Sequence, residues 1–269
     1  MSQSTTSTSP PRPATSSPPA AEPRGRVRIE PGHKRVRAYL GGELVVDTAR
    51  AALVWEVPYY PAYYLPLEDV VDGRLVPSAT ANHSPSRGDA RYFTVRAGGR
   101  EAVDAAWTYP DSPIEQLRTL VRFDWQAMDS WFEEDVEVFT HPRDPYKRID
   151  ALVSSRHVQV EVNGVIVADT HHPTVLFETS LPPRFYIPKT DVRMDLLEPT
   201  DSSSSCPYKG TARYWSVRAG EQLVADLAWS YPTPLPESAP VAGLVCFYNE
   251  KVDLRVDGVA QDRPHTVFS

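Results

Sequence analysis

The chain has 269 residues, of which 41% are hydrophobic and 23% are charged, and its formal net charge is −7. This balance is typical of a soluble protein with a core, and the negative charge disfavours a general nucleic-acid binder, which usually presents a basic face. No apolar run has the roughly 18 residues of a membrane span, no apolar secretory segment lies near the start, and two cysteines are too few for a disulfide scaffold. We therefore expect a cytoplasmic protein without a membrane or nucleic-acid partner.

Residues 1–24 form a distinct segment, because sixteen of them are Ser, Thr or Pro. Such a segment cannot bury enough apolar surface to offset its ordering entropy, so we expect a disordered tail. Proline is frequent throughout, with 27 residues. Proline breaks helices and is confined to strand edges and turns, and short Val- and Tyr-rich runs recur along the chain. The sequence therefore predicts an all-β fold, with one short helix at 112–120.

The main feature of the sequence is an internal repeat. A shift of 122 residues superimposes residues 35–110 on 157–232 without a gap, with 27 identities in 76 positions. The chain is therefore predicted to be a tandem duplication. The first repeat is expected at 25–140, a linker stiffened by prolines at 141–155 and the second repeat at 156–269. Taking Val136 and Val252 as counterparts, we expect the region before Val136 to be about six residues longer than its counterpart.

Each repeat begins with the pattern of a β-hairpin. In the second repeat, valines alternate with polar residues over 158–162, and Asn163-Gly164 follows. This pair suits the two positive φ angles of a type I′ turn, and Gly41-Gly42 occupies the same place in the first repeat. A second hairpin is predicted around the turn Ala219-Gly220, between Thr211–Arg218 and a strand that ends near Pro232.

The turn before that second hairpin, Cys206 to Gly210, carries candidate chemistry. Cys206 lies three residues before Lys209, and a nearby ammonium favours a thiolate that can act as a nucleophile or redox group. Glu178 ends an apolar run, and a buried carboxylate suits a general acid or base. The alternative is structural: the thiol closes a turn, and Glu178 pairs with Lys209 or Arg213.

The duplication separates what belongs to the fold from what is particular to one repeat. The first repeat reads Ser84-Pro85-Ser86-Arg87-Gly88 at this turn, so the basic residue is kept while Cys206 and Tyr208 have no counterpart. A basic group in both repeats indicates an ion pair with Glu56 and Glu178 or with Asp69 and Asp191, or else an anionic ligand.

Further side chains are candidates for binding a ligand. Aromatic residues of the second repeat pack in the core or line a pocket that stacks on a flat molecule. His141 and Arg143 in the linker are placed to reach a cleft between the repeats. His171-His172 has no further His or Cys at metal-ligand spacing, so we expect no metal and no cofactor. The candidate ligand-binding residues are Tyr186, Asp191, Arg213, Tyr214, Trp229 and Tyr231.

The combined motifs resemble a bacterial family catalogued as domain of unknown function 427. The residues that carry this resemblance are Asp169-Thr170, Glu178, Phe185 to Pro188, Asp191-Val192, Cys206 to Gly210, Tyr214-Trp215 and Trp229 to Pro232. The resemblance covers both repeats and implies two tandem tent-like antiparallel β domains. Most other tent-like families bind zinc through four cysteines, which this chain lacks. The activity of the family is not established, so the resemblance implies no reaction.

These observations lead to three alternative functions. The first is binding of a small anionic or planar molecule in a pocket of the second repeat, with the first repeat as a diverged partner. The second is an enzyme that acts on a small molecule, with Cys206, Lys209 and Glu178 as catalytic residues. The third is a protein-interaction module that exposes the aromatic run from Tyr59 to Tyr64.

Overall fold

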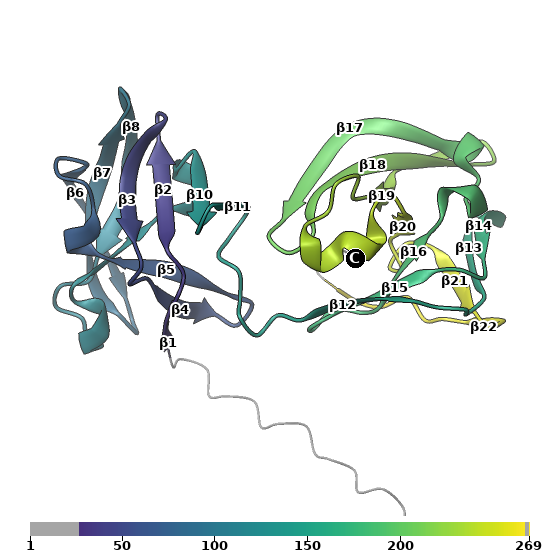
Figure 1. Ribbon diagram of the computed structural model, residues 1–269, viewed down its shortest axis with the longest axis horizontal. Helices are drawn as coiled ribbons and strands as arrows, with labels where there is room; N and C mark the ends of the chain where they lie inside the picture. The colour runs from purple at the N-terminus through teal and green to yellow at the C-terminus, as the bar shows by residue number, and fades with distance from the viewer. Residues whose placement is uncertain (1–26, 267–268) are drawn as a thin grey trace, which may run out of the picture.

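A computed structural model of the chain describes residues 27–266 and residue 269. The tail expected to be disordered, residues 1–24, lies outside the described residues. Figure 1 shows two similar halves that are both built from strands. Each half has a seven-stranded and a four-stranded sheet, and every strand pair in them is antiparallel. This arrangement confirms the predicted all-β tandem duplication. No helix in the described ranges has the length and hydrophobicity of a membrane span.

In the first half, the seven-stranded sheet has the order β1-β4-β5-β9-β8-β7-β6 and the smaller sheet the order β11-β10-β2-β3. The larger sheet contains β1 (Arg28–Pro31), β4 (Ala52–Val57), β5 (Tyr60–Pro66), β9 (Leu120–Phe123), β8 (Arg100–Thr108), β7 (Gly88–Ala97) and β6 (Leu75–Ser84). The smaller sheet contains β11 (Val136–Val138), β10 (Ser130–Glu133), β2 (Val36–Leu40) and β3 (Glu43–Thr48). Three single-turn 3₁₀ helices accompany them: η1 (Leu67–Asp69), η2 (Glu115–Leu117) and η3 (Trp125–Ala127).

The second half repeats this order strand for strand, as β12-β15-β16-β20-β19-β18-β17 and β14-β13-β21-β22. The larger sheet contains β12 (Ile149–Val153), β15 (Thr174–Glu178), β16 (Arg184–Ile187), β20 (Val245–Phe247), β19 (Gln222–Ser230), β18 (Gly210–Ala219) and β17 (Leu197–Cys206). The smaller sheet contains β14 (Val165–Thr170), β13 (Val158–Val162), β21 (Asp253–Val256) and β22 (Val259–Ala260). The 3₁₀ helices are η4 (Lys189–Asp191), η5 (Met194–Leu196) and η6 (Pro236–Val241).

Two local expectations about the chain between these elements need correction. The helix expected at 112–120 is only the single turn η2. The counterpart of Val136 is not Val252, because Val136 begins β11 and Val259 begins the equivalent β22. The region before Val136 is therefore not six residues longer than its counterpart. In addition, β12 lies within the stretch expected to be a linker, yet it pairs with β15 in the larger sheet of the second half.

The predicted hairpin turns are confirmed by their backbone angles. Asn163 and Gly164 have φ values of 49° and 80°, and Gly41 and Gly42 have values of 60° and 75°. Two positive φ angles in succession are what a type I′ turn requires. The second hairpin also forms, but its turn lies one residue later than predicted, at Gly220-Glu221, because Ala219 pairs with Gln222, and Gly220 has a φ of 65°.

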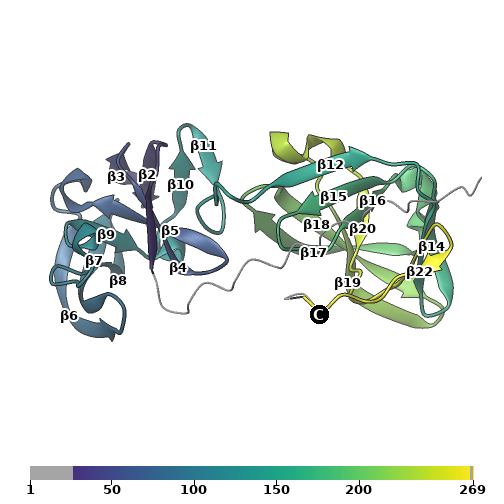
Figure 2. The same cartoon turned by 90° about the horizontal axis from the view of Figure 1, so that it is seen from below.

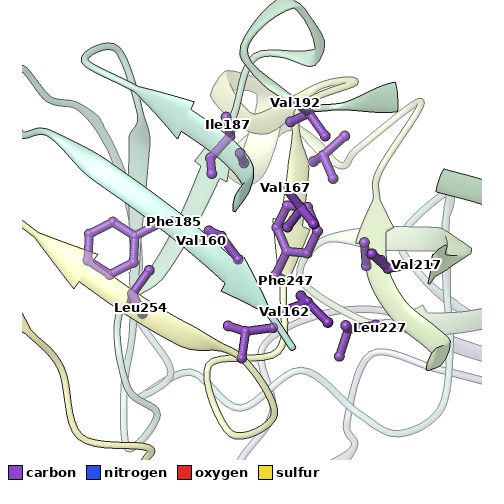
Figure 3. Packing of buried hydrophobic residues seen from close by; sticks show 14 of the residues in the cluster. Val160, Val162, Val167, Phe185, Ile187, Val192, Val217, Leu227, Phe247 and Leu254 are labelled. Carbon is purple, nitrogen blue, oxygen red and sulfur yellow. The ribbon is translucent and has the colours of Figure 1, made fainter. Parts of the chain in front are cut away.

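The faces of β16 show how the fold prepares a site. All four residues of this strand are buried, although side chains on a strand alternate between its two faces. Phe185 and Ile187 belong to the core between the two sheets, together with Val160 and Leu254 (Figure 3). Tyr186 lies on the opposite face in a second apolar cluster with Trp229 and Tyr231. The larger sheet is therefore covered on both faces in this region.

The segment between β11 and β12 crosses from one half to the other and contacts both (Figure 2). The His141 ring stacks on Tyr60 of the first half, with 4.1 Å between ring centroids. The Asp144 carboxylate accepts a hydrogen bond of 3.2 Å from Trp55 Nε1. The Asp144 backbone N–H donates to the Tyr208 hydroxyl of the second half at 2.6 Å. Side chains of both repeats therefore hold this segment in place.

Candidate functional site

The second repeat contains a cavity of about 290 Å³ on the face of its larger sheet that carries Tyr186 and Trp229. Eight of the residues singled out from the sequence line it: His141, Glu178, Tyr186, Cys206, Lys209, Tyr214, Trp229 and Tyr231. They come from the linker, from β15, β16, β17, β18 and β19, from the turn that follows β17 and from the residue that follows β19. Residues that are up to 90 positions apart in the chain are thus brought to one cavity.

The Cys206 turn is placed by the pairing of two long strands. Cys206 ends β17 and pairs with Gly210, which begins β18, so Pro207 to Lys209 form the connection. Gly210 has a φ of 92°, a conformation that side chains with a Cβ rarely adopt. This geometry explains why the glycine is present in both repeats, and it directs Lys209 towards the end of β15.

Lys209 and Glu178 form a buried ion pair at the cavity. The Lys209 ammonium donates to Glu178 Oε2, and the two side chains are 12% and 7% exposed. Burial acts to lower the pKa of Lys209, but the neighbouring Cys206 and Glu178 outweigh it, so the pKa lies above its ordinary value. Lys209 is therefore a charged hydrogen-bond donor at neutral pH and not a free amine. Lys147 also approaches, with Nζ 3.9 Å from Glu178 Oε1.

The two cysteines differ in access. Cys206 is half-buried and lines the cavity, whereas Cys246 is fully buried under it, and burial raises the pKa of the Cys246 thiol to about 12. Both are free thiols. Of these two, Cys206 is the one that a molecule in the cavity can reach.

Aromatic side chains form much of the cavity wall. Trp229 Nε1 donates to the Tyr186 hydroxyl at 3.3 Å, and the rings of Trp229 and Tyr248 are 4.5 Å apart. The hydroxyls of Tyr214 and Ser204 share a hydrogen bond of 2.6 Å. Burial raises the pKa of both Tyr186 and Tyr231, so their hydroxyls stay neutral. The wall therefore combines flat apolar surfaces with polar edges.

Arg184 is a lining residue that the sequence interpretation missed. Its two terminal nitrogens donate to both oxygens of Glu250, at 2.7 and 2.6 Å, and the side chain is 8% exposed. The guanidinium also lies 5.7 Å from the centre of the Trp229 ring. A comparison of the two repeats could have pointed to Arg184, because the aligned residue of the first repeat is Ala62.

Three of the expected site residues lie elsewhere. Asp191 follows β16 in η4 and accepts a hydrogen bond of 2.6 Å from Thr170, as Asp69 does from Thr48 in the first repeat. This pair ties η4 to β14, so the role of Asp191 is structural. Arg213 is exposed on β18, because alternation gives the cavity side to Tyr214. Arg143 lines a different cavity beside the first repeat and lies 3.5 Å from Glu237.

Tyr208 does not line the cavity, although it lies two residues after Cys206 in the chain. Its hydroxyl accepts the hydrogen bond from Asp144 N–H, and its ring meets the edge of His141 at 6.3 Å. Burial raises the pKa of Tyr208, so the hydroxyl is neutral. Tyr208 therefore holds the linker, while Cys206 faces the cavity.

The chemistry that this arrangement offers comes from an ion pair, a thiol and polar aromatic edges. Among residues 27–266 and 269, no group of three or more His, Cys, Asp or Glu side chains could hold a metal ion. The aromatic faces can stack on a flat molecule, and Glu178, Lys209 and Cys206 can exchange hydrogen bonds with its edge.

Comparison with known proteins identifies the two halves. None of the curated proteins matches the chain. Residues 28–134 and 150–258 each match the family described as a domain of unknown function (DUF427). The two matches begin at β1 and just inside β12 and end just before β11 and β22, so each covers all but the last strand of one structural half. The chain therefore belongs to the DUF427 family and carries two copies of its domain.

Proposed function

We propose that the second repeat binds a small planar molecule in the cavity lined by Glu178, Cys206 and Lys209. The observation that carries this proposal is the convergence of eight sequence-selected side chains on one cavity of about 290 Å³. A volume of this order suits a single small ring system. A cytoplasmic location fits the two free thiols, because the cytoplasm keeps cysteines reduced.

A planar ligand is favoured over a simple anion by the charges of the lining. Lys209 already pairs with Glu178, and Arg184 already pairs with Glu250. An anion would have to compete with a carboxylate for either cation, and breaking a buried pair costs several kcal/mol. A ring that stacks on Trp229 or Tyr214 keeps both ion pairs intact. An anionic substituent on such a ring is then an addition to stacking and not the main source of affinity.

A thermal-shift screen of the full chain with purines, pyrimidines and aromatic carboxylates tests this proposal. Ser204 is exposed at the cavity edge on β17, so Ser204→Trp should fill the entrance at the cost of one exposed hydrogen bond, that of Ser204 with the Tyr214 hydroxyl. We expect at least one compound to raise the Tm of the wild-type chain and to lose that effect in Ser204→Trp. Ser203→Trp is the matched control, because Ser203 is exposed on the same strand and does not line the cavity. A compound that shifts all three chains equally, or no active compound at all, would contradict the proposal.

An enzyme is the second candidate, and the position of Cys206 favours it. The thiol lines the cavity next to an ammonium that is charged at neutral pH, and a neighbouring ammonium favours the reactive thiolate. In this case the Cys206 thiolate would attack an electrophilic centre of a bound molecule and form a covalent bond with it, Lys209 would stabilise the negative charge that develops there, and Glu178 would position Lys209.

The third alternative, an interaction module, was expected to use an exposed aromatic surface, and much of that surface is buried. Tyr63 and Tyr64 are 6% and 0% exposed, and Tyr60 stacks on His141. Tyr59 and Tyr60 are the exposed tyrosines of the run, at 70% and 41%. The aromatic run is therefore not the exposed patch that was expected, because β5 buries most of it in the first repeat.

A further inference from the structure

We propose that the first repeat has a binding site of its own, which takes an oxyanion between Arg87 and Arg122. The ligand is a small molecule with a carboxylate or phosphate group. This inference is independent of the cavity in the second repeat, because it depends on other residues and on a different charge balance.

The site is a groove of about 350 Å³ at the place that corresponds to the cavity of the second repeat. Its aromatic residues Tyr92, Trp107 and Tyr109 are the aligned counterparts of Tyr214, Trp229 and Tyr231. Asn82, His83 and Ser84 form one edge of the groove, on β6. The duplication has therefore kept the shape of the site and its aromatic wall.

Strand register shows which side chain changes the chemistry. Trp107 pairs with Arg122, and Trp229 pairs with Cys246. Tyr64 likewise pairs with Arg122, and Tyr186 with Cys246. Arg122 and Cys246 therefore occupy equivalent positions. A guanidinium in the first repeat stands where the second has a neutral thiol.

The charges of the first groove do not balance. Glu56 is 12% exposed and accepts hydrogen bonds from Arg122 and from the Tyr64 hydroxyl. Arg87 lies further away, with Nη1 3.6 Å from Glu56 Oε1. Two guanidinium groups thus share one carboxylate whose oxygens already have donors. In the second repeat, each lining cation has its own carboxylate partner.

Arg87 and Arg122 are held in place and keep donors available. Arg87 is 17% exposed, its Nε donates to the Tyr109 hydroxyl at 3.2 Å, and its Nη1 has only the long 3.6 Å approach to Glu56, so Nη2 is the terminal nitrogen that is left for a ligand. Arg122 is 28% exposed, and its guanidinium lies 4.8 Å from the centre of the Trp107 ring. A planar guanidinium with a fixed orientation is suited to bidentate binding of a carboxylate or phosphate. An oxyanion here would neutralise the excess positive charge of a half-buried groove.

The test uses the full chain, with inorganic phosphate and acetate as probes and chloride at equal ionic strength as the reference. We expect phosphate, acetate or both to raise the Tm of the wild-type chain relative to chloride. This rise should be lost in Arg122→Cys, which copies the second repeat, and reduced in Arg87→Gln. The active probe identifies the phosphate or carboxylate group.

Two controls separate this site from general salt effects and from the other cavity. Arg91→Gln removes an exposed arginine that pairs with Asp111 on the surface, and it should keep the full rise. Ser204→Trp obstructs the cavity of the second repeat and should also keep it. The proposal is overturned if the wild-type chain shows no rise relative to chloride, or if Arg87→Gln and Arg91→Gln show the same rise as the wild-type chain.

Discussion

The basic residue of the turn before β7 or β18 approaches a glutamate in both repeats. Lys209 pairs with Glu178, and Arg87 lies 3.6 Å from Glu56. Removing one partner of a buried pair leaves an uncompensated charge and costs about 3–5 kcal/mol. This cost explains the basic group of the second repeat, where Lys209 is the nearest cation to Glu178, whereas in the first repeat Arg122 also pairs with Glu56. In the second repeat the same pair places an ammonium beside the Cys206 thiol.

Alkylation of the native chain tests whether this ammonium activates Cys206. Iodoacetamide should label Cys206 and spare Cys246, which is fully buried and whose pKa burial raises to about 12. Lys209→Met removes the ammonium and leaves the Glu178 carboxylate without this partner. The loss of the positive charge and the remaining negative charge both disfavour the Cys206 thiolate. We expect the labelling rate to fall on the order of tenfold, because the thiolate is the form that reacts with iodoacetamide.

Lys147→Met is the control for that experiment. Lys147 approaches the same glutamate at 3.9 Å but does not line the cavity, so its removal should leave the labelling rate nearly unchanged. Equal rates in the wild-type chain and Lys209→Met would remove the support for Cys206 as a nucleophile. The two variants carry the same change in net charge, so a long-range field effect would slow both alike.

At the residue scale, the direction of a side chain can be predicted from the sequence where residues simply alternate between the two faces of a strand. Arg213 and Tyr214 are neighbours on β18 and therefore point to opposite faces, and the cavity side belongs to Tyr214. Asp191 was a candidate for the ligand site or for an ion pair with the basic residue of the turn, but it accepts a hydrogen bond from Thr170, as Asp69 does from Thr48. Arg184 was missed because β16 is buried on both faces, so periodicity could not show which of its residues face a cavity.

At the element scale, the repeats join the same two turns by different contacts. In the first repeat, the β2–β3 turn and the β7–β8 turn approach so closely that a Cβ on Gly98 would collide with the backbone of Gly41. In the second repeat, the Asn163 side chain instead donates to Gln222 at 3.0 Å. Direct backbone packing needs glycine at both positions, whereas a side-chain hydrogen bond needs space for a side chain.

This difference predicts unequal costs at two adjacent glycines. Gly98 and Gly99 both have positive φ, at 53° and 71°, but nothing lies within 4 Å of a Cβ on Gly99. Gly99→Ala should therefore lower the free energy of unfolding by about 1 kcal/mol, the cost of the left-handed backbone alone. Gly98→Ala should add about 1–3 kcal/mol for the forced separation of the two turns. Urea denaturation followed by tryptophan fluorescence measures both, and equal costs would show that the turns move apart freely.

The correspondence between strands of the two repeats could be predicted from the sequence wherever one constant shift relates the repeats. The shift of 122 residues correctly aligned β2 to β8 with β13 to β19, and the turn residues at 41–42 and 163–164 confirmed it. The shift then becomes 124 at Arg122 and Cys246 and 123 at β10 and β21, as the register of each pair shows. Small length changes of this kind have no signal in one sequence. They hid the exchange of Arg122 for Cys246, which changes the charge at the site.

At the scale of the whole molecule, the linker belongs to the site as well as to the junction. Thr140 and His141 line the cavity of the second repeat, and the Thr140 hydroxyl donates to the Ser205 carbonyl at 2.9 Å. The same His141 ring stacks on Tyr60 of the first repeat. A change in the packing of the two repeats would therefore change one wall of the cavity. This coupling gives the first repeat a structural influence on the site of the second.

The His141 ring makes this junction sensitive to acid. Burial lowers the pKa of His141, and this effect outweighs the hydrogen bond between Nδ1 and the Pro142 carbonyl. A histidine whose pKa is lower in the folded state contributes full stability above its unfolded pKa of about 6.5. That contribution is lost as the pH falls through the folded value, because the unfolded chain takes up the proton first.

His141→Phe keeps a flat ring against Tyr60 but cannot take up a proton, so it isolates this effect. We expect the free energy of unfolding of the wild-type chain to fall relative to that of His141→Phe between about pH 7.5 and pH 5. Urea denaturation at both pH values measures the difference, in which the other titrating groups largely cancel. His172→Phe, at an exposed histidine, is the control and should keep the wild-type pH dependence. A difference between wild type and His141→Phe that does not change with pH would show that the junction tolerates a charged imidazole.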